Sequence, residues 1–305
     1  MTVIVRDFRP GDAEAFARVR RLALPYMLHT AGSVAYDVAH AHPGAHHRPL
    51  VAEEDGELIG TAQVGLVHDS PLPGQGYVNV YVHPGRTGRG AGSLLARTAE
   101  ERLAGLGATR LYAWVLDAPE NRAFARARGY RPGRSAHFLG LDLATAGLPP
   151  RPELPPDVEL RTAADFADDP RPLFALDAET MADEPGDIDH EFTDYEAWLT
   201  GTWRHPLLDL GLTTVAVVDG RPAAFSAART DGERYGTVMT GTGRAYRGRG
   251  LAKLAKTDSL HRARAAGYRE AVTGNDAGNG PMLAINKWLG YEIRATEVQY
   301  VRDLG

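Results

Sequence analysis

A basic, glycine-rich stretch in the second half of the chain has the composition of an anion-binding site. It lies between a predicted strand at 236–243 and a predicted helix at 251–266 and reads Arg247-Gly248-Arg249-Gly250-Leu251-Ala252. A turn at a helix N-terminus directs several unpaired backbone amides to one place, where the positive end of the helix dipole also lies. Because glycine has no Cβ, the backbone can approach a bulky anion closely. The stretch therefore predicts a phosphate or pyrophosphate site.

A related stretch occurs in the first half of the chain. It follows an apolar run at 77–82, precedes a helical pattern at 93–106, and contains Gly88, Arg89, Gly90, Ala91, Gly92 and Ser93. In both halves an Asp-Gly turn precedes the loop, and a short strand, a second helix and a Gly-Tyr pair follow it. These features recur at a spacing of about 160 residues, which indicates an internal duplication.

The duplication predicts two domains joined by a linker. The nine residues 148–156 contain five prolines, which make a stiff connection. We therefore expect an N-terminal domain at 1–147, a proline-rich linker at 148–156 and a C-terminal domain at 157–305. The second copy restarts with a strand-like segment at 158–161, and the strand-like sequence at 291–302 is expected to close it.

Composition excludes several classes of function. The chain has no cysteine, so it has no disulfide, thiolate nucleophile or cysteine-based metal site. Its net charge of −5 and lack of a basic face argue against nucleic acid as a partner. No apolar run is long enough to span a membrane, and the charged N-terminal segment does not resemble a signal peptide. We expect a cytoplasmic protein that is a monomer or a homodimer.

The histidine-rich segment at 36–47 is the one candidate metal site in the sequence. It contains His40, His42, His46 and His47. Histidines in a loop with proline and glycine are more often solvated than metal-bound, so we expect no metal there.

The glycine-rich loops narrow the class of ligand. Neither the Walker pattern G-x-x-x-x-G-K-[ST] nor the dinucleotide pattern G-x-G-x-x-G occurs. The R-x-x-G-x-A order of residues 247–252 after a strand instead resembles the acyl-CoA loop of the GNAT acetyltransferases, and the resemblance covers nearly the whole chain. It implies an α/β fold (a mixed α+β sheet) with two tandem GNAT-like domains, each a mixed, mostly antiparallel sheet flanked by helices. It also implies acetyl-CoA as donor, and direct transfer to an amine without a covalent enzyme intermediate.

The resemblance further implies which positions would contact acetyl-CoA. The strand before each loop would offer its backbone to the pantetheine arm, at Thr240, Gly241 and Thr242 in the second copy and at Val80, Tyr81 and Val82 in the first. The two glycine-rich loops would hold the pyrophosphate. Asn279 stands where members commonly carry an asparagine that contacts CoA.

The resemblance is incomplete at the position of the general acid. Members commonly carry a tyrosine that protonates the departing thiolate, but this chain has Asn286 in the second copy and Ala125 in the first. Asn286 could hydrogen-bond the sulfur, water could supply the proton, or Asn286 could be a cap or surface residue. In the first copy Thr87 replaces the arginine that opens the loop. That copy is compatible with binding CoA without catalysis or with serving as a packing partner, so we favour the second copy as catalytic.

An acidic segment lies where the family places the cover of its acceptor site. Twelve acidic residues fall between Asp165 and Glu196. A negative pocket would attract a cationic amine and could relay its proton. We expect Glu179, Asp183 and Glu184 to do so, although a solvated acidic helix end is an equally simple interpretation.

Two classes of function follow. The first is N-acetylation of a small, cationic amine by acetyl-CoA, or of a cysteinyl pseudodisaccharide, because a tandem with one degenerate half resembles mycothiol synthase in organisation. The second is a non-catalytic acyl-CoA-binding or sensing module, which the missing tyrosine favours and the intact Arg247 loop disfavours.

Overall fold

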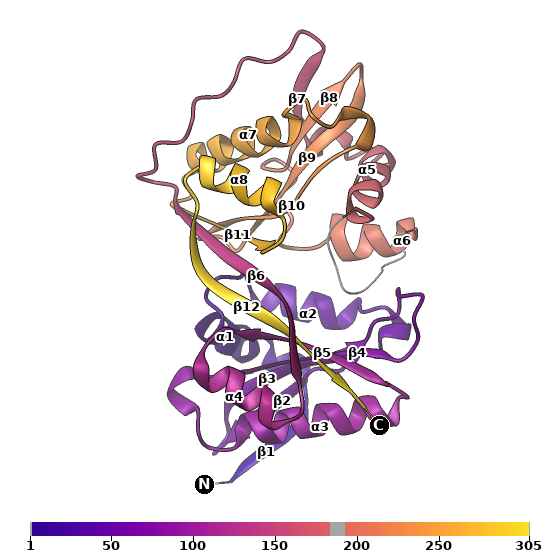
Figure 1. Cartoon of the computed structure of the whole chain (residues 1–305), viewed down its shortest axis with the longest axis vertical. Helices are drawn as coiled ribbons and strands as arrows, with labels where there is room; N and C mark the ends of the chain where they lie inside the picture. The colour runs from indigo at the N-terminus through magenta and orange to yellow at the C-terminus, as the bar shows by residue number, and fades with distance from the viewer. Residues whose placement is uncertain (1, 184–192, 305) are drawn as a thin grey trace. The chain divides into compact units, whose positions relative to one another are not determined.

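The computed structural model describes residues 2–183 and 193–304 (Figure 1). The described chain forms two compact units, one made of residues 2–136 and 295–304 and the other of residues 137–183 and 193–294. The two boundaries fall inside strands, one in β6 (Arg131–Asp142) and the other in β12 (Glu292–Asp303). Each unit therefore takes one segment from the far half of the chain.

The first unit is a mixed sheet with strands in the order β1-β2-β3-β4-β5-β12. Its own strands are β1 (Val3–Asp7), β2 (Leu50–Glu54), β3 (Glu57–Leu66), β4 (Gln75–Val82) and β5 (Arg110–Leu116). Neighbours among β1 to β4 are antiparallel, whereas β4 and β5 are parallel. The helices are α1 (Ala13–Ala23), α2 (Ala31–Ala39), α3 (Ala91–Gly105) and α4 (Pro119–Ala127). The apolar face of α3 carries Leu95, Ala99 and Leu103, each 0% exposed, at the spacing that turns one side of a helix toward a sheet.

The second unit repeats this plan. Its strands are β7 (Val158–Thr162), β8 (Thr214–Val218), β9 (Arg221–Thr230), β10 (Tyr235–Thr242) and β11 (Glu270–Asp276), with β6 next to β11. Strands β7 to β10 are antiparallel, and β10 is parallel to β11. The helices are α5 (Arg171–Met181), α6 (Tyr195–Trp198), α7 (Leu251–Ala265) and α8 (Gly280–Trp288). Single turns of 3-10 helix are η1 (Pro10–Asp12), η2 (Pro43–Ala45), η3 (Pro84–Arg86), η4 (Ala163–Phe166) and η6 (Arg244–Tyr246), and η5 (Leu199–Trp203) is a π-helical turn.

The predicted hairpins and loop-flanking elements are confirmed. Asp55-Gly56 joins β2 to β3 and Asp219-Gly220 joins β8 to β9, with all four residues at positive φ. This backbone is that of the tight turn which Asp-Gly favours, because it follows the twist of the strands. The helices predicted after the two glycine-rich loops are α3 and α7. The segment at 36–47, expected to be a loop, is helical up to Ala39.

The final strand pairs differently from the expectation. We expected 291–302 to close the second copy, but Glu297–Asp303 runs antiparallel to β5 in the first unit. Tyr300 is 1% exposed and belongs to the core of that unit, and Asp303 forms ion pairs with Arg110 and Arg131. An alternating strand pattern shows which side chains are buried and does not identify the neighbouring strand.

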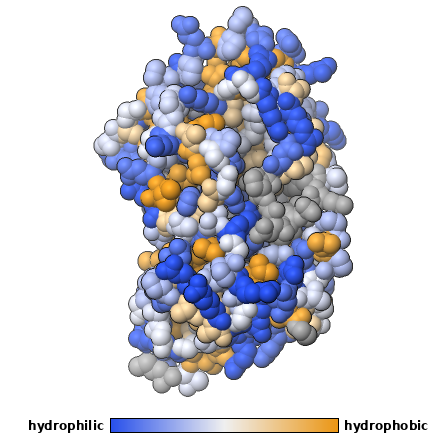
Figure 2. All heavy atoms as spheres, in the orientation of Figure 1, coloured by the Kyte–Doolittle hydropathy of each residue, from blue (hydrophilic) through white to orange (hydrophobic). Residues whose placement is uncertain are grey.

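The apolar residues of each unit lie mainly inside it. On the face shown in Figure 2, hydrophobic residues appear in small groups separated by hydrophilic ones. None of the helices in the described part of the chain is long and apolar enough to cross a membrane.

Candidate functional site

The two glycine-rich loops have the same backbone conformation. Gly248 and Gly250 have φ of 77° and 75°, and Gly88 and Gly90 have φ of 76° and 87°. A side chain is strained at such angles, so glycine is required at all four positions. A Cβ placed on any of the four meets no atom within 4 Å. The space in front of both loops is therefore open to a ligand.

Each loop leads into a long helix whose first turn has no side-chain cap. Helix α7 begins after Gly250 and α3 after Gly90, and neither N-cap residue makes a side-chain hydrogen bond. The predicted contact residues Leu251 and Ala252 lie in the first turn of α7, and the corresponding residues of the first copy lie in the first turn of α3. A 15-residue helix with uncapped amides beside an open glycine turn fits the pyrophosphate of a coenzyme.

The loop arginines are engaged by carboxylates. Arg249 pairs with Asp157 at 2.6 Å, and Arg89 of the first copy pairs with Glu54 at 2.7 Å. Arg247 pairs with Asp183, and its Nε donates to the Thr242 carbonyl at 3.3 Å. These ion pairs hold the arginine side chains in place, so an anion bound at the loops would lie near cations that are already oriented.

The predicted acceptor-site acids contact the turn that precedes the second loop. Asp183 accepts hydrogen bonds from Arg244 at 2.9 and 2.7 Å and from Arg247, and these two guanidinium groups lower its pKa to about 2. Glu179 accepts from the Arg244 backbone amide at 2.6 Å. Both carboxylates therefore hold η6 in place. Glu184 lies outside the described residues.

The strand before the second loop has one edge without a β-sheet partner along half its length. The parallel pairing of β10 with β11 covers Tyr235–Thr237 and ends there, and the pairing with β9 shifts register between Thr237 and Met239. The predicted contact residues Thr240, Gly241 and Thr242 follow this bulge. The Thr180 side chain covers one face of Gly241, while the backbone edge toward β11 has no strand pairing in the described chain. An extended amide such as a pantetheine arm can pair with such an edge.

The first copy is arranged differently at this point. Its strand β4 also pairs with β5 over only three residues, Gln75–Tyr77, and Val80, Tyr81 and Val82 lie beyond them. Here, however, the Asn79 side chain accepts a hydrogen bond from the Trp114 amide at 2.8 Å. A side chain thus joins the two strands where their backbone pairing has ended.

The asparagines of the second copy lie at α8. Asn279 is the N-cap of α8, and its Oδ1 accepts from the Met282 amide at 3.2 Å. Asn286 is 0% exposed, and its Nδ2 donates to Oδ1 of Asn275 on β11. The Asn286 Oδ1 is buried and has no hydrogen-bond partner in the described chain. The surface interpretation of Asn286 is therefore wrong, and one of its polar atoms is free for a ligand.

Three further polar residues of the second copy were not singled out by the sequence. Asn275 is the partner of Asn286, Tyr291 has a buried hydroxyl beside the Thr237 side chain, and Lys256 is 1% exposed. Lys256 sits at helical spacing on α7, where an apolar residue was expected to face the sheet. A lysine at a buried position of a helix was the signal that could have identified it.

The acid position of the first copy has no polar group. Ala125 is buried on α4, and Asn121 donates to the Leu116 carbonyl at 3.1 Å. The histidines of the segment at 40–47 make local contacts, including His47 Nδ1 with the Tyr77 hydroxyl at 2.8 Å and His42 stacked on His68. Across residues 2–183 and 193–304, no three potential metal ligands come together.

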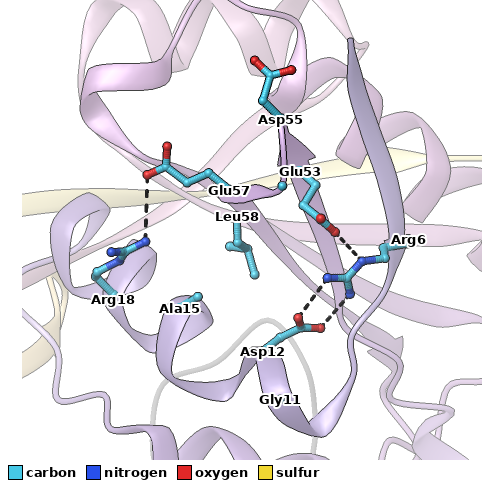
Figure 3. A pocket seen from close by; sticks show the side chains of 10 residues that line it. Arg6, Gly11, Asp12, Ala15, Arg18, Glu53, Asp55, Glu57 and Leu58 are labelled. Atoms are coloured by element: carbon cyan, nitrogen blue, oxygen red, sulfur yellow. Dashed lines mark hydrogen bonds and ion pairs between the residues drawn. The ribbon is translucent and has the colours of Figure 1, made fainter. Parts of the chain in front are cut away.

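A polar pocket in the first unit lies between β1, α1 and the β2–β3 hairpin (Figure 3). At one side of the pocket, Arg6 donates to Glu53 at 2.5 Å and to Asp12 at 2.7 and 2.9 Å. The guanidinium of Arg6 lowers the pKa of Asp12. The pocket is thus lined by two basic and four acidic side chains, with Arg6 paired to Asp12 and Glu53 and Arg18 paired to Glu57, and it does not include either glycine-rich loop.

Comparison with known proteins agrees with the duplicated fold. Residues 16–130 match the acetyltransferase (GNAT) family and residues 153–277 match an acetyltransferase (GNAT) domain. Mycothiol acetyltransferase of Nocardia farcinica is 31% identical over 267 residues, covering 86% of this chain and 84% of its own length. The mycothiol acetyltransferase of Nocardiopsis dassonvillei is 28% identical over 286 residues, with coverage of 86% and 84%.

Solved structures show the same fold along the whole chain. A tandem GNAT protein from the clavulanic acid biosynthesis pathway has a TM-score of 0.75 at 21% identity, covering 100% of this chain and 99% of its own. A GCN5-related N-acetyltransferase from Sphaerobacter thermophilus has a TM-score of 0.73 at 22% identity, covering 99% and 95%. The expectation of two tandem GNAT-like domains is confirmed.

Proposed function

Because the chain belongs to the GNAT acetyltransferase family as a tandem, two-domain member, we propose that its second copy acetylates the primary amine of a small, polar molecule with acetyl-CoA. One observation carries the choice of the second copy. Beside its open loop, β10 has an edge without strand pairing after Thr237, and Asn286, which is bonded to Asn275 of the neighbouring β11, has a buried Oδ1 without a partner in the described chain. A polar donor arm would satisfy both.

In the proposed reaction, acetyl-CoA supplies an acetyl group that is activated as a thioester. The amides of Gly248 to Ala252 bind the pyrophosphate, and the edge of Thr240 to Thr242 aligns the arm. Alignment of this kind turns a bimolecular reaction into an effectively unimolecular one. The amine nitrogen attacks the thioester carbon, the carbon–sulfur bond breaks, and the sulfur takes up a proton. The chain needs no cysteine for this reaction, and it has none.

The proposed acceptor is cationic in solution. The acidic segment at 165–196 would raise the local concentration of an ammonium-bearing molecule. Two of its described members, Glu179 and Asp183, are engaged by Arg244. The proposal for a cation therefore depends on the other acids of the segment, and Asp183 with a pKa of about 2 is too weak a base to take its proton.

A second candidate acceptor comes from the relatives. Proteins named mycothiol acetyltransferase match this chain at 28 and 31% identity over most of their length. Acetylation of the amine of a cysteinyl pseudodisaccharide is therefore the alternative within the same reaction class. The second class considered above, a module that binds acyl-CoA without catalysis, has no support in the comparisons.

A panel of amines tests the proposal. The purified chain would be incubated with acetyl-CoA and either aminoglycoside-like polycations, simple diamines or a cysteinyl pseudodisaccharide, and acetylated products would be measured by mass spectrometry, since a thiol assay would respond to the cysteinyl acceptor itself. We expect one class to be acetylated far faster than acetyl-CoA is hydrolysed. A panel in which no amine is acetylated above the Gly250→Val control would contradict the proposal.

A further inference from the structure

Lys256 of α7 is a buried amine without a counter-charge. Its side chain is 1% exposed, and its Nζ lies 5.3 Å from the centre of the Tyr291 ring. No carboxylate of the described chain pairs with it, and burial lowers its pKa. Burying an ammonium group without a partner is costly, so such a lysine usually has a functional reason. None of the roles considered so far uses it.

Contacts place Lys256 in the region between α7 and α8 that contains Asn286 and Tyr291, which we call the seam. Lys253, one turn earlier on the same side of α7, has its Nζ 3.4 Å from the centre of the Trp288 ring on α8. Asn286 in turn connects α8 to β11 through Asn275. Helix α7 packs against β8, β9 and β10, and α8 lies beside it in Figure 1. Lys256 therefore lies where α7 approaches Tyr291, the second residue after the Leu289 C-cap of α8.

The level of Lys256 along β10 follows from the next turn of the helix. Ser259 Oγ lies 2.6 Å from the hydroxyl of Tyr235, at the start of β10, whereas the helix begins at the loop that follows the end of β10. Lys256 is three residues closer to the loop than Ser259, a shift of about 4.5 Å along the helix axis. Because the Tyr235 hydroxyl itself accepts a hydrogen bond from Thr237 Oγ1 at 3.2 Å, that shift of between one and two strand residues brings Lys256 to the level just beyond Thr237. Thr237 is where β10 stops pairing with β11 and its register shifts.

Two buried polar groups share this seam with Lys256. Oδ1 of Asn286 has no hydrogen bond to a described residue, and the Tyr291 hydroxyl lies beside the Thr237 side chain of β10. The Tyr291 amide donates to the Asn286 carbonyl at 3.0 Å, so the two residues are held together. Buried polar groups nearly always have partners, so the Asn286 Oδ1 and an ammonium without a carboxylate indicate that a polar ligand completes the seam.

Lys256 is the group of the seam that can exchange a proton near neutral pH. Burial lowers the pKa of Lys256 to about 7 and raises the pKa of Tyr291, so the phenol stays neutral. From β10 the seam is faced by Tyr235, whose pKa burial also raises; α8 and β11 contribute the amides of Asn286 and Asn275. On α7 itself, Lys253 lies over Trp288, and Asp258 is paired with Arg262 and Arg151.

We infer that Lys256 is the proton donor of the second copy, an inference that rests on the proposed acetyl transfer. The acceptor amine forms the new carbon–nitrogen bond, the carbon–sulfur bond breaks, and the departing sulfur takes a proton from the Lys256 ammonium. The proton that the acceptor nitrogen sheds passes through solvent and recharges the lysine. Atoms and charge balance, and no other reactant is needed.

The chemistry explains why the lysine is buried. An exposed lysine, with a pKa of about 10.4, is a weaker acid than a thiol of pKa about 8.5 and would not protonate the thiolate efficiently. Burial makes the ammonium the stronger acid of the two. Asn286, at the position where the family commonly has a tyrosine, cannot donate such a proton and keeps the seam polar instead.

The first experiment follows Lys256 by nuclear magnetic resonance without any acceptor. The chain has three lysines, Lys253, Lys256 and Lys287, so a lysine-labelled sample gives few signals and Lys256→Met assigns one of them. We expect Lys256 to titrate near pH 7 in the free protein and at a different pH with bound CoA, because a thiol that hydrogen-bonds the amine changes its affinity for a proton. Desulfo-CoA, which lacks the sulfur, should leave the titration unchanged. An ordinary lysine titration, or equal responses to the two ligands, would overturn the inference whether or not an acceptor is known.

The second experiment measures the proton transfer itself. Lys256→Met should bind CoA normally by calorimetry and lose about 100-fold in kcat, the typical contribution of a general acid. A thioester donor with a strongly acidic thiol needs no proton on departure, so it should restore most of the lost rate. Lys256→Arg, which stays charged but is a far weaker acid, should behave like Lys256→Met. Normal CoA binding with an unchanged kcat, or a loss that the acidic thiol does not restore, would contradict the role of Lys256.

The two experiments separate this inference from the proposed function. If wild-type protein acetylates no amine, the proposed function fails, while the thiol-dependent titration still decides whether Lys256 faces the sulfur. If acetylation occurs and the titration is ordinary, the proposed function stands and the inference fails.

Discussion

The glycine-rich loops of the two copies have the same backbone conformation, but the side chains in the seam beside each loop differ. Counting from the helix N-caps Gly90 and Gly250, Ala96 of the first copy corresponds to Lys256 of the second. Counting back four residues from Gly129-Tyr130 and Gly290-Tyr291 likewise places Ala125 opposite Asn286, and in both copies the tyrosine amide donates to the carbonyl of that residue. The first copy therefore has two alanines where the second has an amine and an amide.

The remaining polar group of the seam also differs. Tyr130 of the first copy donates its hydroxyl to Glu100 at 3.2 Å, and Glu100 is also bound by Arg128 and Arg302. In the described part of the chain the corresponding Tyr291 has no carboxylate partner, and its buried hydroxyl lies beside the Thr237 side chain. In the first copy, moreover, Asn79 joins the strands that stop pairing. The polar groups of the first copy's seam are thus bonded to one another, whereas the second copy's seam contains a buried polar atom, Asn286 Oδ1, without a partner in the described chain.

This difference teaches that a glycine-rich loop is insufficient evidence of a donor site. Both loops have open space in front of them, so both could attract a pyrophosphate. Only the second copy, in the described chain, combines the loop with an unpaired strand edge, the orphaned Oδ1 of Asn286 and a buried lysine. We therefore predict one acetyl-CoA site per chain, in the second copy, with the first copy as a packed partner.

The largest expected effect concerns β12, the strand near the end of the sequence that pairs with β5 in the first unit. Replacing Tyr300 with alanine should lower the free energy of unfolding by about 3–5 kcal/mol, because a fully buried aromatic ring leaves a cavity in the first unit. Hydrogen exchange should show the loss in the first unit, around β5, although the substitution lies near the end of the chain. Tyr300→Phe, which retains the ring, is the matched control. Exposure of second-unit amides alone would contradict the strand exchange.

The next effect separates the two loops. Gly250→Val should weaken CoA binding by about 100-fold, since a β-branched residue at positive φ strains or displaces the turn. Gly90→Val introduces the same strain at the corresponding position of the first copy and should leave CoA affinity unchanged. Calorimetric titration of both variants and wild type gives affinity and stoichiometry together. Two sites in wild type, with one lost in each variant, would show that the first copy also binds CoA.

Sequence reasoning was most successful where function requires a particular backbone. The glycines at 88, 90, 248 and 250 and the Asp-Gly turns identify their own conformations, because few other residues tolerate positive φ. It was less successful with contacts between distant segments. Nothing local in 297–303 indicates pairing with β5, and the ion pairs of Asp183 with Arg244 and Arg247 cross about 60 residues of sequence. The seam around Lys256 could be recognised only after α7, α8 and β11 had been placed together.

A smaller effect tests whether the hydrogen bond between Asn79 and Trp114 is what prevents the first copy from binding CoA. Met239 of β10 occupies the position of Asn79 in β4, counted from the paired residues of each strand. Met239→Asn should let the new amide bridge β10 to β11, and we expect about tenfold weaker CoA binding by calorimetry. The reciprocal Asn79→Ala leaves the Trp114 amide unpaired and should cost about 1–3 kcal/mol of stability. It should add no second CoA site, because Ala96 and Ala125 remain. A second site in Asn79→Ala would mean that this one hydrogen bond is what closes the first copy.

The smallest effect concerns Asp183, which was expected to serve the acceptor. Arg244 and Arg247 lower its pKa to about 2, so it stays ionised at any pH where transfer is measured and cannot be the group that titrates as a base.

The pH dependence of folding stability follows from the same shift in the pKa of Asp183. A folded-state pKa below the ordinary value of about 3.9 means that the ion pairs favour the folded state above that pH, and the benefit disappears as the pH falls toward 2. Because the carboxylate is at the surface, the benefit should be small. Asp183→Asn should therefore change kcat less than about threefold and leave the shape of its pH profile intact, with a modest change in CoA affinity through Arg247. Loss of the acid limb of the kcat profile in this variant would restore Asp183 as the base and move the proton chemistry of the second copy toward its acidic segment.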